Sequence, residues 1–116
     1  MLLEMLKSKL HNATVLKVEL NYSGSLSIDK NLMEKANIQP YEKIDVFNMN
    51  NGNRFSTYAI PAKKGMICVN GAAARLAIPG DKLIIVSYCL LNPIEAQEHK
   101  PVILILDEKN NIVSIP

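Results

Sequence analysis

The sequence contains no tryptophan and little else that is aromatic, only four tyrosines and two phenylalanines among 116 residues. A core must therefore be built mainly from Leu, Ile, Val, Ala and Met side chains. Cysteine is also scarce. Cys68 and Cys89 lie in apolar surroundings, with no Cys-x-x-Cys pair and only two histidines in the whole chain. We therefore expect no metal site and treat both thiols as small buried side chains, while a disulfide between them stays open although nothing requires one.

An excess of charge of one sign is missing as well. The formal net charge is +2, and the densest basic run is the pair Lys63-Lys64. Nucleic-acid-binding proteins usually show a basic stripe interleaved with aromatic residues, so we expect no nucleic-acid partner. No apolar run approaches the ~20 residues that cross a bilayer. Glu4, Lys7 and Lys9 also interrupt the N-terminal apolar residues, so we expect no signal peptide, no membrane association and a cytoplasmic location.

The length and composition fit one compact globular domain. A chain of 116 residues can bury one modest core, and its 48% hydrophobic and 21% charged residues are ordinary for such a domain. Because small domains often gain stability by associating, an oligomer is a reasonable expectation.

Short segments with a period of two indicate strands. Residues 15–21 would place Leu16, Val18 and Leu20 on one face and polar side chains on the other. Further predicted strands cover residues 25–28, 43–49, 54–60, 65–69, 82–90 and 102–106.

Helix and turn signals separate these strands. Asp29 is a suitable N-cap for a helix over residues 30–36, and Pro93 suits the start of a helix over 93–98. The alanine-rich residues 70–75 predict one helical turn. Asn51-Gly52 between two strands is a strong hairpin signal. Short strands at close spacing favour a barrel, which leaves no exposed edges. The sequence therefore predicts a small, mostly β barrel with short helices.

The usual catalytic signatures are absent, since the chain has no Gly-x-Ser-x-Gly elbow, no phosphate-binding glycine loop and no His-Glu-x-x-His. Four local groupings remain: Lys9 with His11, residues 22–25, residues 54–58 and residues 70–74. Taken singly, each has an ordinary structural explanation as solvated strand residues, a turn, half-buried strand residues or a short helix.

Taken together, these groupings resemble bacterial aspartate alpha-decarboxylase, in the same order and at nearly the same spacing. The resemblance covers roughly residues 1–90, and its most specific element is the decapeptide Asn51–Ile60. It implies a six-stranded double-psi β-barrel assembled as a homotetramer, with active sites between subunits. The implied reaction converts L-aspartate to β-alanine and carbon dioxide for pantothenate and coenzyme A synthesis. The chain departs from the pattern at Asn12, where arginine is frequent, and beyond about Asn92 it does not align.

The resemblance also implies a pyruvoyl cofactor made from Ser25. Self-cleavage at Gly24-Ser25 would divide the single domain, residues 1–116, into a β chain (1–24) and an α chain (25–116). Gly24 suits this step because a residue without Cβ permits strained backbone and close approach. By resemblance, Thr57 would stabilise the developing oxyanion. A maturation factor accelerates cleavage in some relatives, so one is a candidate partner here.

The implied substrate contacts make chemical sense. A pyruvoyl carbonyl would bind the amino group of aspartate as a Schiff base and act as the electron sink. Arg54 offers a planar fork for a carboxylate and Lys9 a second positive charge. Tyr58 is the implied proton donor, since phenols, with a pKa near ~10, are protonated at neutral pH.

Other implied site residues bind or support. Backbone N–H groups at the start of a helical turn favour anions. The residues expected to bind the substrate are Gly71, Ala72 and Ala73, together with Thr57 and Asn70. Tyr22 and His11 are expected to support these groups.

The alternative is a catalytically silent β-barrel used for binding or assembly, including transcription-regulator-like barrels. It predicts that Ser25→Ala leaves the biological activity intact. The basic face expected of such a regulator is not present in the sequence.

Overall fold

A computed structural model describes all residues, Met1–Pro116. It has nine strands and three short helices. The strands are β1 Leu3–Thr14, β2 Lys17–Glu19, β3 Ser25–Asp29, β4 Lys43–Asn48, β5 Arg54–Ala62, β6 Ile67–Asn70, β7 Lys82–Leu91, β8 Val102–Leu106 and β9 Ile112–Ser114. The helices are α1 Lys30–Ala36, the 3-10 helix η1 Gly71–Leu76 and α2 Pro93–Glu98. The predicted small, mostly β domain with short helices is confirmed.

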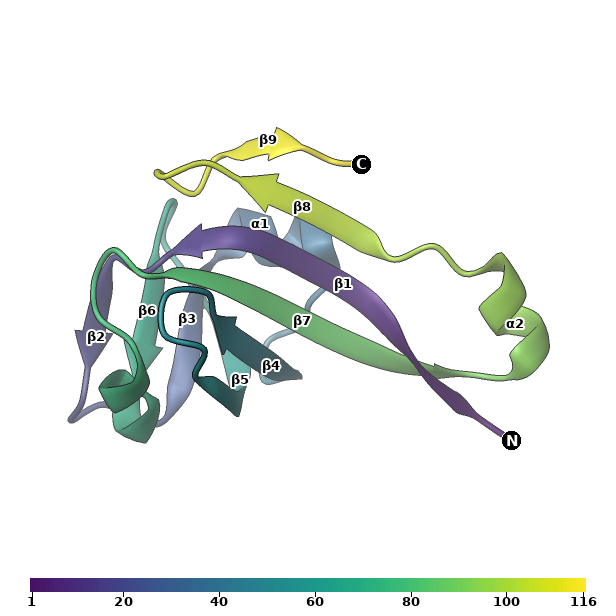
Figure 1. The fold of residues 1–116 in the computed structure, drawn as a ribbon, viewed down its shortest axis with the longest axis horizontal. Coiled ribbons are helices and arrows are strands. Elements are labelled where there is room, and N and C mark those ends of the chain that lie inside the picture. The colour runs from purple at the N-terminus through teal and green to yellow at the C-terminus, as the bar shows by residue number, and fades with distance from the viewer.

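The strands join in the order β2-β6-β3-β5-β4-β7-β1-β8-β9. The sheet thus holds nine strands rather than the six expected, with β2 at one end and β9 at the other. Strand β3 pairs in parallel with β5 and antiparallel with β6. Figure 1 shows β2, β6 and β3 at one end of the molecule, whereas the long β1–β7 pair extends to the other end and carries α2.

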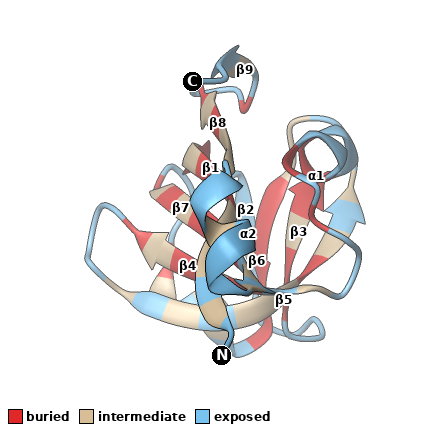
Figure 2. Ribbon diagram, turned by 90° about the vertical axis from the view of Figure 1, so that its right-hand side faces the viewer, coloured by how far each residue is buried: buried red, intermediate tan, exposed pale blue.

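The core lies on the inner side of this curved sheet. It is almost wholly aliphatic, as the scarcity of aromatic residues requires, and comprises 19 buried residues in one cluster. Leu10, Ile85 and Val46 lie opposite one another on β1, β7 and β4, and all three are buried. Helix α1 adds three buried side chains, whereas α2 buries none (Figure 2). The inner face of the sheet is therefore the face on which these buried residues of neighbouring strands lie.

The local cap and turn signals are confirmed. Asp29 caps α1 by accepting hydrogen bonds from the backbone N–H groups of Asn31 and Leu32. Asn92 and Glu95 form a capping box at the start of α2. The Asp29 cap and the start of α2 at Pro93 depend on neighbouring residues alone, which is why they could be predicted from the sequence, whereas the capping box was not predicted.

The predicted half-buried strand over residues 15–21 is wrong in extent. Only Lys17–Glu19 form a strand, and both Leu16 and Leu20 are exposed. The backbone N–H groups of Val15 and Leu16 instead donate to Asp81 and Ile67. Those hydrogen bonds hold the segment that connects β1 to β2. They therefore replace the strand pairing that the alternating pattern predicted for residues 15–16.

Strand β1 shows the opposite error, because no long strand was predicted at residues 3–14. Its pairing with β7 shifts register between Leu6 and Ser8 and again between His11 and Ala13. Asn12, at the second shift, has a positive φ of 67°. Each bulge inserts one residue and so breaks the period of two by which a strand is recognised.

Candidate active site

Ser25 begins β3 and lies opposite Asn70, the last residue of β6. It is almost completely buried, with 1% of its surface exposed. The Asn70 side-chain amide donates to the Ser25 hydroxyl at 3.0 Å and to the Ser27 hydroxyl at 2.9 Å. The Ser25 hydroxyl in turn donates to the Ser23 carbonyl at 3.2 Å. The serine oxygen is therefore held in one place by contacts on both sides.

The thiol of Cys68 fixes the orientation of that amide. Its sulfur lies 3.1 Å from the Asn70 side-chain oxygen, so the amide NH₂ is directed at the two serines. Cys68 is buried, as expected, and burial raises the pKa of its thiol, an effect that nearby Lys17 partly opposes. Cys89 is a free, half-buried thiol. Cys68 thus takes part in the polar chain that reaches Ser25, a role that its apolar sequence neighbours did not suggest.

The close backbone approach occurs at Gly71 rather than at Gly24. Gly71 has a φ of +72°, and a Cβ on it would lie 2.6 Å from the Gly24 Cα and 3.1 Å from the Tyr22 carbonyl oxygen. Gly24 itself has no positive φ and has open space where a Cβ would be. The need for glycine is therefore strict at position 71, because two backbone segments meet there.

The other binding candidates in this segment begin η1. Ala72 is exposed and Ala73 packs partly against the core. The Asn70 side chain does not cap η1, since its hydrogen bonds go to the serines. Tyr22 is exposed beside the same turn and contributes its backbone carbonyl to the contact with Gly71.

Strand β5 brings Thr57 and Tyr58 next to this segment. The parallel pairing with β3 begins at Leu26 opposite Ala59. The ladder ends there, and if the same register were extended by one residue Ser25 would lie beside Tyr58, and by two Gly24 would lie beside Thr57. Both side chains are half-buried, and no side-chain hydrogen bond joins them to Gly24 or Ser25.

Alternation along the strands assigns these side chains to two faces. Thr57 lies opposite buried Ile44 and therefore on the inner face. Tyr58 lies opposite exposed Lys43, on the outer face. Arg54 shares the outer face and places its guanidinium 4.6 Å from the centre of the Phe47 ring. It forms no ion pair, so its charge is available to a carboxylate.

Lys9 and His11 lie elsewhere in the same chain. Both are on β1, which β7 and β4 separate from β5. Three strand spacings amount to roughly 14 Å between the strand backbones, so Lys9 and Arg54 are not neighbours within a single copy. Lys9 forms no ion pair. The Nδ1 atom of His11 is buried without a hydrogen-bond partner.

The sequence reading missed three residues near this site. Ser27 accepts a hydrogen bond from the same Asn70 amide as Ser25. The two serines are two residues apart on a strand and so lie on one face, which is a signal that the sequence contains. Cys68 contacts Asn70, and its i, i+2 spacing on β6 is the corresponding signal. Tyr41 packs against Tyr58 with ring centres 6.3 Å apart. No sequence pattern predicts that contact, because it joins a turn to a strand.

No group of three or more His, Cys, Asp or Glu side chains is arranged to hold a metal ion. None of the three helices has the length and apolar character needed to cross a membrane.

Comparison with known proteins gives one consistent result. The family model described as aspartate decarboxylase matches residues 1–113. The aspartate 1-decarboxylase of Clostridium acetobutylicum is 55% identical over 115 residues, which cover 97% of this chain and 91% of that protein. The same enzyme of Clostridium botulinum is 56% identical over 114 residues, covering 97% and 90%. That of Clostridium kluyveri is 54% identical over 117 residues, covering 99% and 92%.

Proposed function

The chain belongs to the aspartate decarboxylase family, and on that premise we propose that it converts L-aspartate to β-alanine and carbon dioxide by means of a pyruvoyl group made from its own Ser25. The product would enter pantothenate synthesis. One observation carries the proposal. Ser25, the residue directly after Gly24, is buried, and its hydroxyl accepts a hydrogen bond from the Asn70 side-chain amide.

The residues around position 25 fit a pyruvoyl group. The Ser25 side chain is enclosed, and the Asn70 amide already donates to its oxygen. During cleavage this oxygen would leave with Gly24 and the keto oxygen would take the place of the residue 25 nitrogen, so the Asn70 amide would hold the serine oxygen before cleavage. A pyruvoyl group there would supply an electrophilic carbonyl that accepts the electron pair left when carbon dioxide departs.

Cleavage would begin with attack of the Ser25 oxygen on the Gly24 carbonyl carbon. A C–O bond forms while the C–N bond breaks, and the hydroxyl proton passes to the freed nitrogen of residue 25. Loss of the Cα proton then expels the Gly24 carboxylate and leaves dehydroalanine at position 25. Water replaces the nitrogen as ammonia leaves. Thr57, beside Gly24 in the extended register, would donate to the oxyanion of the first step.

For the decarboxylation, the side chains on the outer face have distinct parts. Arg54 carries an unpaired guanidinium that can bind a carboxylate through two parallel hydrogen bonds. Tyr58, next to Ser25 in the extended register, would return a proton to the substrate carbon. The backbone N–H groups of Gly71, Ala72 and Ala73 lie on the same segment as Asn70, where they could bind the other end of the substrate.

In this scheme a second copy would supply Lys9. Within one chain β7 and β4 separate it from Arg54. Subunits of a homotetramer with sites between them would bring Lys9 of one copy to Arg54 of another, and His11 lies on the same strand to support it. The separation of the two cations within one chain is what supports assembly as part of the proposal.

Intact-mass spectrometry of the purified protein tests the self-cleavage. We expect a fragment that ends at Gly24 and a second that begins with a pyruvoyl group at position 25. Ser25→Ala should abolish both fragments and the formation of β-alanine. Ser27→Ala is the matched control, because Ser27 accepts from the same Asn70 amide but is not at the cleaved bond; it should still be cleaved.

A wild-type chain that stays whole on prolonged heating and forms no β-alanine would refute the proposal and favour the catalytically silent barrel. Cleavage that occurs only after addition of a cell extract would point to a maturation factor. Size-exclusion chromatography with light scattering tests the tetramer, and cell fractionation tests the cytoplasmic location.

A further inference from the structure

Tyr41 has an unusual conformation for a large side chain. Its φ is +71°, in the left-handed region that bulky residues rarely adopt, and 77% of its surface is exposed. A strained backbone persists only where its surroundings enforce it, and such positions cluster at functional sites. The contacts that enforce this one can be followed through the structure.

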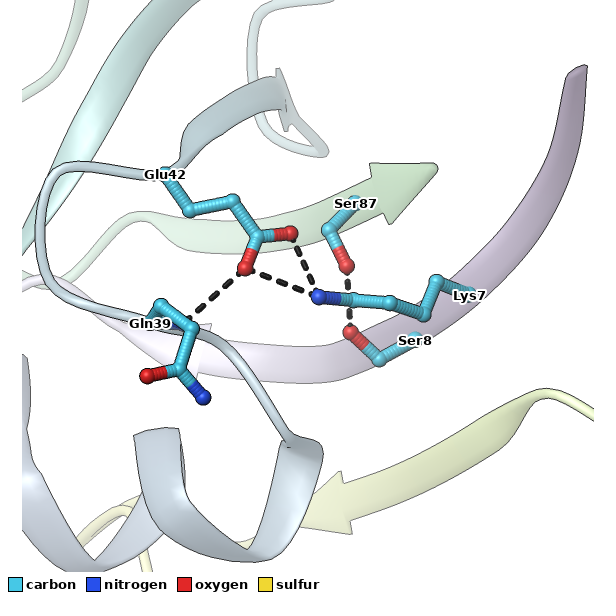
Figure 3. A network of polar contacts seen from close by, with 5 residues as sticks. All are labelled: Lys7, Ser8, Gln39, Glu42 and Ser87. Atoms are coloured by element: carbon cyan, nitrogen blue, oxygen red, sulfur yellow. Dashed lines mark hydrogen bonds and ion pairs between the residues drawn. The ribbon is translucent and has the colours of Figure 1, made fainter. Parts of the chain in front are cut away.

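An ion pair from a distant strand holds the turn that carries Tyr41. The Lys7 ammonium, on β1, contacts the two carboxylate oxygens of Glu42 at 2.8 and 2.6 Å. The same carboxylate accepts the backbone N–H of Gln39 at 2.9 Å. Figure 3 shows Lys7 reaching from β1 to this turn. The two charged side chains are only 21% and 20% exposed, so water screens the pair less than it would at an open surface.

The turn is also bonded to β5, immediately after the proposed proton donor. The N–H of Tyr41 donates to the Ala59 carbonyl at 2.7 Å, and the N–H of Ala59 donates to the Glu42 carbonyl at 3.0 Å. Tyr41 is thereby fixed beside Tyr58, with the two rings 6.3 Å apart and inclined at 40°. This is a favourable tilted arrangement for two aromatic rings.

Tyr58 depends on such a neighbour because its hydroxyl forms no hydrogen bond within the chain. Within one copy, packing then decides where the ring lies. Resting on the proposed function, we propose that Tyr41 is a positioning residue that holds the Tyr58 ring at the angle needed for proton transfer. The Lys7–Glu42 ion pair acts through it by keeping the turn in its left-handed conformation.

The decisive variant is Tyr41→Gly. Glycine adopts a positive φ without strain, so the turn should be kept and the relieved strain should offset the lost ring packing. The ring is lost, and we expect kcat to fall roughly 3- to 10-fold, the size of one aromatic contact. KM, the melting temperature and the rate of self-cleavage should stay at the wild-type values. Tyr41→Phe keeps the ring and should restore kcat.

Two further variants separate this role from a general effect on folding. Asn37→Gly is the matched control, because Asn37 also has a positive φ, of 59°, at the end of α1; its kcat should be unchanged. Glu42→Gln keeps an acceptor for Gln39 but removes the ion pair, and should lower kcat in the same direction as Tyr41→Gly, with KM again constant.

The result that would overturn the positioning role is a Tyr41→Gly enzyme with wild-type kcat, or one whose kcat falls only together with its melting temperature. Each variant is compared with wild-type protein that is cleaved and active. If the wild-type protein is neither cleaved nor active, the proposed function itself is refuted, so the two failures can be told apart.

Discussion

Gly71 and Gly24 are in direct backbone contact, so close that a Cβ on Gly71 would lie 2.6 Å from the Gly24 Cα and 2.9 Å from its nitrogen. The bond proposed to be cut is therefore positioned by a residue 47 positions away in the chain, at the start of η1. A side chain at position 71 would therefore force the backbone at Gly24 or at Gly71 itself to shift.

Gly71→Ala should consequently block or slow self-cleavage. A displaced peptide that raises the barrier by ~1.4 kcal/mol already slows the reaction about tenfold, and we expect at least that in a time course followed by intact mass. Gly80→Ala is the matched control. Its φ is also positive, +94°, but a Cβ there meets no atom within 4 Å. Equal cleavage rates in the two variants would show that the contact does not matter.

Arg54→Lys should weaken substrate binding while cleavage continues. Lysine keeps the positive charge but cannot form two parallel bonds to a carboxylate. Loss of one charge-assisted hydrogen bond costs about 1.5–3 kcal/mol, so kcat/KM should fall roughly 10- to 100-fold. Arg75→Lys, another exposed arginine without an ion pair, should leave steady-state kinetics unchanged. A similar loss in both variants would contradict a specific role for Arg54.

Stability should fall at alkaline pH in a way that depends on Cys68. Burial raises the pKa of this thiol above its ordinary value of 9.0. Above about that pH the unfolded chain releases the proton while the folded chain still holds it, so unfolding becomes more favourable until the folded thiol also ionises. Denaturant titrations at a series of pH values should show this decline in the wild type.

Cys68→Ser provides the comparison. A serine hydroxyl can still donate to Asn70 but does not titrate in this range, so the decline above pH 9 should be smaller than in the wild type. Identical pH profiles would mean that other groups, such as Tyr88, whose pKa burial also raises, account for the whole effect.

Asn110→Ala should be strongly destabilising. The buried Asn110 side chain accepts from the Thr14 N–H at 2.7 Å and donates to the carbonyls of Thr14 and Gly65 at 3.0 and 2.9 Å. Three lost bonds and an unsatisfied buried N–H should lower the free energy of unfolding by about 2–4 kcal/mol. Exposed Asn111→Ala should change it little. A small effect at Asn110 would mean that the C-terminal strands add little to stability.

Local signals accounted for much of the fold. Asp29, Pro93 and the strand at residues 102–106 were placed correctly because caps, proline and short alternating runs act between neighbours in the chain. The period of two failed at residues 15–21 and within β1 for a shared reason. In both places hydrogen bonds to distant segments decide the backbone path, at a crossing in one case and at bulges in the other.

The site divides in the same way. The sequence alone determined the family and the chemical groups that the proposed chemistry needs. These groups are a Gly-Ser bond, a phenol, a guanidinium and an amide. Only the tertiary structure decided which of them meet. It joined Ser25 to Asn70 and Gly24 to Gly71, placed Tyr41 against Tyr58 and separated Lys9 from Arg54. Strand pairing is set by the burial of the core as a whole, so these contacts across the sheet have no counterpart in local sequence.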